Sequence, residues 1–242
     1  VAISYTATAV DHAEASFDDG SDDAAQGIDF GWWFQGSGTQ AEAYAVYNLE
    51  ATAGYTAELD VDAVVGGGDT VVLASGATAC TIAPGDGEAW SAVFDTSAAP
   101  GNYAATWTFQ NSDEDLPGAQ SGTDLVLSLN GTVRLRGDYA HNDAVDAGDI
   151  DALYDLIASP SDVARNDLNG DGMIDGNDMD VLIHDLLGTE YGDINLDGNV
   201  SAADYTIWAD HFGDAGAGWA TGDLSGDGQV SAADYTIWAD HF

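Results

Sequence analysis

The twelve-residue segment SAADYTIWADHF occurs twice in this chain, at 201–212 and again at 231–242. Identity over twelve positions at a spacing of 30 residues indicates an internal repeat, because composition alone does not produce it. An acidic loop precedes each copy, and two weaker versions of that loop lie upstream. The repeat therefore predicts a C-terminal region assembled from successive loop–helix units.

The charge balance limits which partners the chain can bind. There are 43 Asp and Glu residues against 3 Lys and Arg, and the formal net charge is −40. The electrostatic field of so many negative charges attracts cations and repels nucleic acid and anionic membrane surfaces. We therefore expect neither nucleic acid nor a membrane as a partner. No apolar run approaches the roughly 18 residues of a membrane span. Cys80 is the single cysteine, which excludes an internal disulfide and a cysteine-rich zinc site.

The hydrophobic period changes near residue 136, which predicts two kinds of domain. Before this point, apolar and polar residues alternate with period two, as at 55–63 and 103–109. At 125–129 the same spacing puts Leu125, Leu127 and Leu129 on one face, and runs with weaker contrast occupy 41–49, 70–75 and 90–95. Many short strands separated by Gly and Asp clusters predict an antiparallel β-sandwich of Ig-like or jelly-roll type over 1–136. Beyond this point the spacing becomes helical, and we expect an α-helical region.

Residues 1–10 also alternate and are followed by a polar, acidic stretch at 11–26. They are either the sandwich's own edge strand or a strand that is exchanged to complete the sheet of a neighbouring copy. The chain begins at Val1 rather than at methionine. We therefore expect that a signal peptide has been removed and that the protein is secreted or on the cell surface.

The acidic loops carry the pattern of a calcium site. Ca²⁺ takes six to eight oxygen ligands. A twelve-residue loop supplies them from Asp or Asn at positions 1, 3 and 5, from a backbone carbonyl at position 7 and from a carboxylate at position 12. Glycine at position 6 allows the sharp turn of the loop. The predicted ligands are Asp167, Asn169, Asp171, Met173, Asp175 and Asp178 in the second loop, Asp193, Asn195, Asp197, Asn199 and Asp204 in the third, and Asp223, Ser225, Asp227, Gln229 and Asp234 in the fourth. The residues at position 7 offer only their carbonyl oxygens, and we predict three Ca²⁺ sites.

The first loop, 138–149, follows the pattern less well. Its predicted ligands are Asp138, Asn142 and Asp149, but Ala140 stands at position 3 and Asp143 replaces the glycine at position 6. This loop is either a fourth Ca²⁺ site or a vestigial loop kept as a structural mate for the second.

Each copy of the repeat places three aromatic side chains on one helical face. In the first copy Tyr205, Trp208 and Phe212 lie at i, i+3 and i+7. The second copy repeats the arrangement with Tyr235, Trp238 and Phe242. We expect these six residues, here called the aromatic face, to form core, and a surface for a partner is the alternative.

The third loop resembles a known family. Aspartate rather than glutamate at position 12, and the run Gly192-Asp193-Ile194-Asn195-Leu196-Asp197-Gly198-Asn199-Val200 continuing to Asp204-Tyr205, resemble a dockerin type I repeat rather than a full EF-hand. The resemblance extends over about 137–242, as two loop–helix pairs at 137–190 and 191–242. It implies structural Ca²⁺ and docking onto cohesins, which are β-sandwiches found outside the cell. A dockerin has two repeats, so the presence of four leaves open whether either pair docks.

The sandwich has a weaker resemblance. The run from Pro100-Gly101-Asn102 to Leu125-Val126-Leu127-Ser128-Leu129-Asn130-Gly131 is similar to the closing hairpin of Ig-like domains in bacterial surface proteins. Trp32 and Trp33 could form a platform for a sugar ring, although alternation along a strand would place one of them in the core. No Ser-His-Asp order or nucleophile elbow occurs, and we expect no enzymatic activity.

Two functions are consistent with this organisation. The first is an extracellular calcium-binding structural protein that self-associates head-to-tail into a fibre or surface assembly, since one chain carries both a sandwich and dockerin-like units. The alternative is a dockerin-bearing carbohydrate-binding or adhesion module that docks onto a cohesin-like scaffold. The expected partners are therefore copies of the same chain or a cohesin-like β-sandwich, with carbohydrate as a further ligand.

Overall fold

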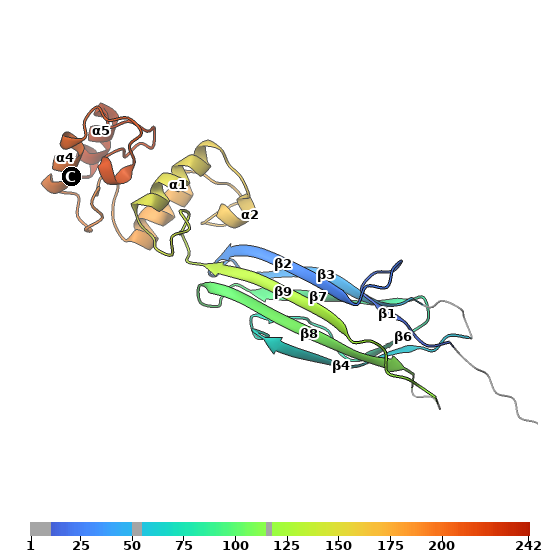
Figure 1. The fold of residues 1–242 in the computed structure, drawn as a ribbon. Coiled ribbons are helices and arrows are strands. Elements are labelled where there is room, and N and C mark those ends of the chain that lie inside the picture. Colours follow the sequence, from blue (N-terminus) through green and yellow to red (C-terminus); the bar gives the residue numbers. More distant parts are fainter. Residues whose placement is uncertain (1–10, 50–54, 115–117) are drawn as a thin grey trace, which may run out of the picture. The chain divides into compact units, whose positions relative to one another are not determined.

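The computed structural model describes residues 11–49, 55–114 and 118–242 and divides the chain into two compact units (Figure 1). The first unit comprises the chain up to Trp32 together with Gly38–Val133, and the second comprises Trp33–Ser37 and Arg134–Phe242. The strand expected at 1–10 lies outside the described residues.

The first unit is a sandwich of two β-sheets, which confirms the predicted fold class (Figure 1). In spatial order, one sheet contains β1 (Ala15–Ser16), β3 (Thr39–Asn48), β7 (Gly87–Asp95) and β5 (Leu73–Ala74). The other contains β2 (Ala25–Phe34), β9 (Leu125–Arg134), β8 (Gly101–Asp113), β4 (Leu59–Gly68) and β6 (Cys80–Ile82). The long strands pair antiparallel, β3 with β7 and β8 with both β4 and β9.

Period-two alternation builds the core of the sandwich. Leu125, Leu127 and Leu129 of β9 are fully buried, while the residues between them are not. Aromatic rings fill the space between the sheets, as where Phe17 meets Phe109 edge to face with ring centroids 5.6 Å apart. Burying each such side chain contributes about 1.5–3 kcal/mol to folding.

Two strands differ from the expectation in extent. The strand predicted at 55–63 begins only at Leu59, and a β-bulge between Val61 and Ala63 shifts its register against β8. The bulge places two residues opposite one and interrupts the inward–outward alternation. The strand predicted at 70–75 is reduced to β5, and Val71 is 92% exposed in the turn before it.

The second unit is α-helical, as predicted. Its helices are α1 (Ala147–Ala158), α2 (Val163–Asn166), α3 (Gly176–Asp180), the π-helix η1 (Val181–Leu187), α4 (Ala202–Asp210), the 3₁₀ helix η2 (Trp219–Thr221) and α5 (Ala232–His241). Within the described residues, none of these helices combines the length and the apolar character that a membrane span requires.

Four of the helices start in the same way. The residue at position 9 of each acidic loop is the N-cap: Asp146 for α1, Asp175 for α3, Ser201 for α4 and Ser231 for α5. In each case the aspartate at position 12 accepts a hydrogen bond from the backbone of the N-cap and completes a capping box. The loop sequence therefore fixes the start of the helix that follows it.

Candidate metal centre

Each acidic loop folds around the aspartate at its first position. In the third loop, the Asp193 carboxylate accepts hydrogen bonds from the amides of Asp197 (3.1 Å) and Gly198 (2.7 Å). Equivalent bonds from positions 5 and 6 reach the first aspartate of the other three loops: Asp138, Asp167 and Asp223. The loop backbone is thus wrapped tightly around one carboxylate.

The aspartate at position 12 closes the loop from the other end. The Asp204 carboxylate accepts from the amides of Ile194 (2.9 Å) and Asn195 (3.2 Å), and its second oxygen accepts from Ser201 (2.8 Å). Asp149, Asp178 and Asp234 make the corresponding contacts to the early loop residues and to position 9. One carboxylate therefore ties together the first residues of the loop and the first turn of the helix.

These two positions bring buried negative charges together. The carboxylates at positions 1 and 12 are at most 2% exposed in the first, third and fourth loops, namely Asp138, Asp149, Asp193, Asp204, Asp223 and Asp234. In the second loop Asp178 is fully buried and Asp167 is half-buried. Burial of paired like charges is costly unless the site offers a compensating cation or strong hydrogen bonds.

The loop backbone has the turn geometry that the glycine at position 6 predicts. Gly198 lies in the left-handed region with φ 87°, and so does Leu196 at position 4 with φ 55°. In the first loop the same two positions are His141 (φ 59°) and Asp143 (φ 64°). The first loop therefore keeps the backbone path of the others without its glycine, at a cost of about 1 kcal/mol or more for each non-glycine residue in this region.

The remaining predicted ligands lie on the loop surface. Asn195 Oδ1 accepts from the Asp197 amide (2.9 Å), and Asp197 Oδ1 accepts from the Asn199 amide (3.0 Å). Asn169 and Asp171 repeat these bonds in the second loop, whereas Ser225 donates to Asp223 (3.3 Å) in the fourth. The other predicted ligands are the exposed residues Asn142, Met173, Asp227 and Gln229 and the half-buried N-cap Asp175.

This donor set suits a hard cation. Carboxylate, amide, hydroxyl and carbonyl oxygens are the ligands that Ca²⁺ prefers, and buried aspartates at positions 1 and 12 would be neutralised by it. Within residues 11–49, 55–114 and 118–242, no group of three or more His, Cys, Asp or Glu side chains is arranged to hold a metal. Calcium loops of this class also use amide, hydroxyl and carbonyl oxygens as ligands. The number of Ca²⁺ sites stays a prediction.

The electrostatics of the first loop also suit a bound cation. Burial raises the pKa of Asp149, and the nearby charges of Asp138 and Asp146 raise it further, while two backbone hydrogen bonds oppose this. A divalent cation beside such a carboxyl group would favour its ionised form.

The two copies of the repeat pack against each other reciprocally. The Trp208 indole Nε1 donates to the Ser231 carbonyl oxygen (2.9 Å), and the Trp238 Nε1 donates to the Ser201 carbonyl oxygen (3.1 Å). Glycines allow this close approach: a Cβ on Gly222 would lie 3.0 Å from the Trp208 Cα, and one on Gly192 would lie 3.1 Å from the Trp238 Cα. The identity of the two copies is the sequence signal that could have predicted these reciprocal hydrogen bonds.

The third and fourth loops each have an apolar residue at position 8, Val200 and Val230. Apolar residues at this position predict that the two loops pair through a short two-stranded contact. Instead the Val230 amide donates to the Asp214 carbonyl (3.0 Å), and the described residues contain no backbone hydrogen bond between Val200 and Val230. The linker after α4 occupies the backbone groups of Val230, and the indole bonds take over the joining role.

The aromatic face is largely solvent-exposed, which corrects the expectation that it forms core. Tyr205 and Tyr235 are each 42% exposed, Phe212 is 57% exposed and Phe242 is 70% exposed, whereas Trp238 is buried. The rings stack across the pair, with the Trp208 and Tyr235 centroids 5.2 Å apart and those of Tyr205 and Trp238 5.3 Å apart. Two short helices can bury only their central rings against each other, so the outer rings remain in contact with water.

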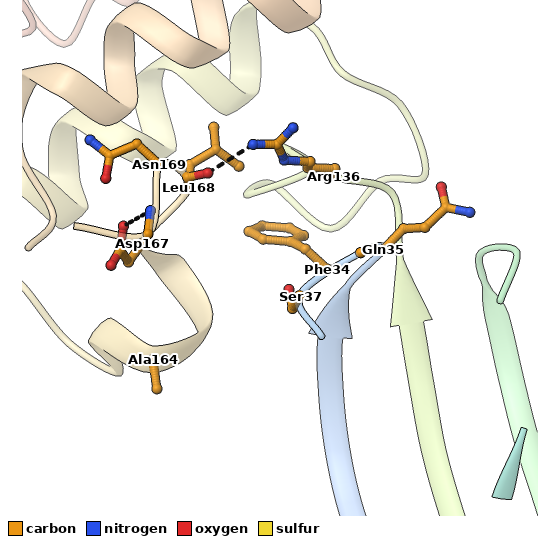
Figure 2. A pocket seen from close by; sticks show the side chains of 10 residues that line it. Phe34, Gln35, Ser37, Arg136, Ala164, Asp167, Leu168 and Asn169 are labelled. Atoms are coloured by element: carbon orange, nitrogen blue, oxygen red, sulfur yellow. Dashed lines mark hydrogen bonds between the residues drawn. The ribbon is translucent and has the colours of Figure 1, made fainter. Parts of the chain in front are cut away.

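A cavity lies beside the second loop (Figure 2). It measures about 430 Å³ and is lined by Phe34, Gln35, Ser37 and Arg136 together with the start of the loop, all within the second unit. The Arg136 guanidinium donates to the Leu168 carbonyl oxygen (2.9 Å) and so fixes position 2 of the loop (Figure 2). Trp33, in the same unit, makes a cation–π contact with Arg165, whose guanidinium carbon lies 5.0 Å from the ring centroid.

Known proteins resemble parts of this chain. No curated protein matches the chain. A solved structure, the ASH / PapD-like domain of human CEP192 (PapD-like domain 7), is similar at 11% identity over 56% of this chain and 97% of that domain, with a TM-score of 0.39. The family model described as the dockerin type I domain matches residues 191–240, which include the third and fourth loops. The resemblance drawn from these loops is thereby confirmed, and residues 191–240 are similar to a dockerin type I domain.

Proposed function

We propose that this protein is a secreted, non-catalytic module that binds Ca²⁺ in its acidic loops and docks through residues 191–242 onto a cohesin-like β-sandwich. The observation that carries the proposal is the dockerin match over 191–240, because docking onto cohesins is the property of that family. The same match favours docking over the self-associating fibre that the sequence also suggested.

The exposed part of the aromatic face supports the proposal. Tyr205 and Tyr235 expose aromatic surface on two adjacent helices, and Phe212 and Phe242 expose it just after the ends of those helices. Aromatic residues are enriched at the centres of protein interfaces, and an exposed cluster of them marks a binding surface. A β-sandwich partner would cover rings that are in contact with water in the free protein.

Calcium has a structural role in this proposal. The ion would be held by Asp193, Asn195, Asp197, Asp204 and the Asn199 carbonyl in the third loop, and by the corresponding residues of the fourth. When bound, it supplies positive charge that offsets the buried carboxylates. The aspartate at position 12 also completes the capping box of the helix that follows the loop. This contact orders the loop relative to the helix that carries the aromatic face.

The division into three parts belongs to the same proposal. The sandwich would occupy 1–136, the first loop–helix pair 137–190 and the second pair 191–242, and only the second pair would dock. The first three loops of this scheme have the same backbone hydrogen bonds as the fourth, so Ca²⁺ binding would not be confined to the docking pair.

Binding of the full-length chain to purified type I cohesin modules tests the proposal. We expect calorimetry to detect binding in Ca²⁺ and none in excess chelator. Phe212→Ala and Phe242→Ala should each weaken binding by at least tenfold, whereas Val71→Ala, which truncates an exposed apolar side chain of the sandwich, should not change it. Absence of cohesin binding combined with Ca²⁺-dependent self-association in ultracentrifugation would replace docking by the fibre.

A further inference from the structure

The second unit contains contacts that join the first loop–helix pair to the fourth loop through residues that are not among the proposed Ca²⁺ ligands. The Tyr154 hydroxyl, on α1, donates to the carbonyl oxygen of Leu224 at position 2 of the fourth loop (2.8 Å). The Tyr154 ring covers Gly226 at position 4 so closely that a Cβ there would lie 2.3 Å from its Cγ. One side chain from the first pair therefore contacts the two residues that flank Ser225.

A second residue of α1 reaches the segment just before that loop. Asp151 Oδ1 accepts from the backbone amide of Trp219 (2.7 Å), the first residue of η2. Gly218 packs against the same carboxylate, since a Cβ at this position would lie 2.3 Å from Asp151 Oδ2. Asp151 thus fixes the path by which the chain enters the fourth loop.

Trp219 carries the connection on to the third loop. Its side chain is fully buried, and its indole Nε1 donates to the carbonyl oxygen of Asp193, the first residue of that loop (2.9 Å). The chain of contacts runs from α1 through Asp151 and Trp219 to Asp193, and in parallel from α1 through Tyr154 to Leu224. Both loops of the docking pair are reached from one face of one helix.

From these contacts we infer that α1 positions the fourth loop for Ca²⁺, so that the first pair acts as an internal brace for the docking pair rather than as a second docking module. The inference rests on the proposed calcium function. Tyr154 and Asp151 are positioning residues, because neither is among the proposed ligands. Preorganisation of a ligand loop lowers the entropy lost on binding, so removal of the brace weakens affinity and leaves the number of ions unchanged.

The test is a Ca²⁺ titration of the full-length chain by chelator competition, with loop-specific readout by NMR. The amides of Gly198 and Gly228 report the third and fourth loops separately, because each donates to the first aspartate of its own loop. Tyr154→Phe removes only the hydroxyl and should weaken binding at the fourth loop by about threefold to tenfold, since a hydrogen bond of this kind contributes about 1 kcal/mol. The second loop should keep its affinity.

The matched control is Tyr103→Phe, which removes a tyrosine hydroxyl bonded to the Ala99 carbonyl oxygen (2.6 Å) in the sandwich and should change nothing. Asp151→Ala should weaken both the third and the fourth loop. Unchanged affinity of the fourth loop in Tyr154→Phe and in Asp151→Ala, or equal weakening of all loops, would overturn the brace. A wild-type chain that binds no ion in these loops would instead overturn the calcium function itself, together with the inference that depends on it.

Discussion

The aspartate at position 12 has two roles at the scale of the single residue. Asp234 accepts hydrogen bonds from Ser225 and Ser231 and caps α5, and it is also a proposed Ca²⁺ ligand. Glutamate at this position would place its carboxylate one methylene further from the backbone donors. The side chain of aspartate, which distinguishes these loops from a full EF-hand, therefore also has the length that suits the capping box.

The two roles can be separated by measuring stability without metal. In excess chelator, Asp234→Ala should lower the free energy of unfolding of the second unit by about 2–4 kcal/mol, because buried amides lose their acceptor and the helix loses the N3 half of its capping box. Asp240→Ala, which removes an exposed acid from the same helix, is the control. Denaturant titration followed by tryptophan fluorescence measures both, and equal curves for the two variants would show that the carboxylate matters only as a ligand.

At the scale of the element, the repeated helices α4 and α5 depend on glycines that precede the loops. Gly222 has φ 100° and meets the Trp208 Cα, so alanine there suffers both backbone strain and a steric clash. Gly213 has a similar φ of 95° but nothing within 4 Å of an added Cβ. The two positions therefore differ mainly in the close approach of the helices.

We expect Gly213→Ala to cost about 1 kcal/mol through strain alone, and Gly222→Ala to cost about 1–3 kcal/mol more through overpacking. Gly192→Ala should resemble Gly222→Ala, because the opposite indole-bearing helix lies equally close. Chemical denaturation of the three variants gives the comparison. Equal losses at Gly213 and Gly222 would mean that the helices can move apart without penalty.

The elements also show what the sequence could predict and what it could not. Alternation identified β9 and β8 because large apolar residues such as Leu125 and Phe109 alternate with residues that are less buried. It gave no such signal over β2, where Gly27, Asp29 and Gly31 interrupt the apolar pattern. It also began the strand at 55–63 four residues too early, since β4 starts at Leu59, and it missed the bulge between Val61 and Ala63, because a bulge depends on the partner strand and leaves no local mark.

The site was predictable to the same degree. Loop spacing located the buried aspartates, because their roles depend on backbone geometry within twelve residues. The aromatic face was wrongly assigned to core, since helical spacing marks an apolar face but not what covers it. The brace contacts of Tyr154 and Asp151 were not predictable, because they join residues about 70 positions apart.

At the scale of the whole molecule, a net charge of −40 opposes compaction, and the second unit concentrates buried carboxylates within its loops. Binding of Ca²⁺ to the folded loops alone would stabilise them by about 2.7 kcal/mol per site at a free concentration of one hundred times Kd. The sandwich of the first unit has no predicted calcium loop and should gain nothing.

Differential scanning calorimetry of the full-length chain therefore should give two transitions, of which only one rises in temperature with Ca²⁺ and falls with chelator. The Asp193→Asn and Asp223→Asn double variant should reduce that rise and leave the other transition in place. Transitions that respond equally to the ion, or not at all, would contradict a separate calcium-dependent unit.

The reciprocal indole bonds constrain how this chain can evolve. The identical segments at 201–212 and 231–242 invite unequal recombination, which would delete one unit of 30 residues. The survivor would retain an indole whose acceptor, a serine carbonyl of the other copy, had been lost. Gain or loss of a single unit would therefore leave an indole without its acceptor, whereas gain or loss of a pair would not.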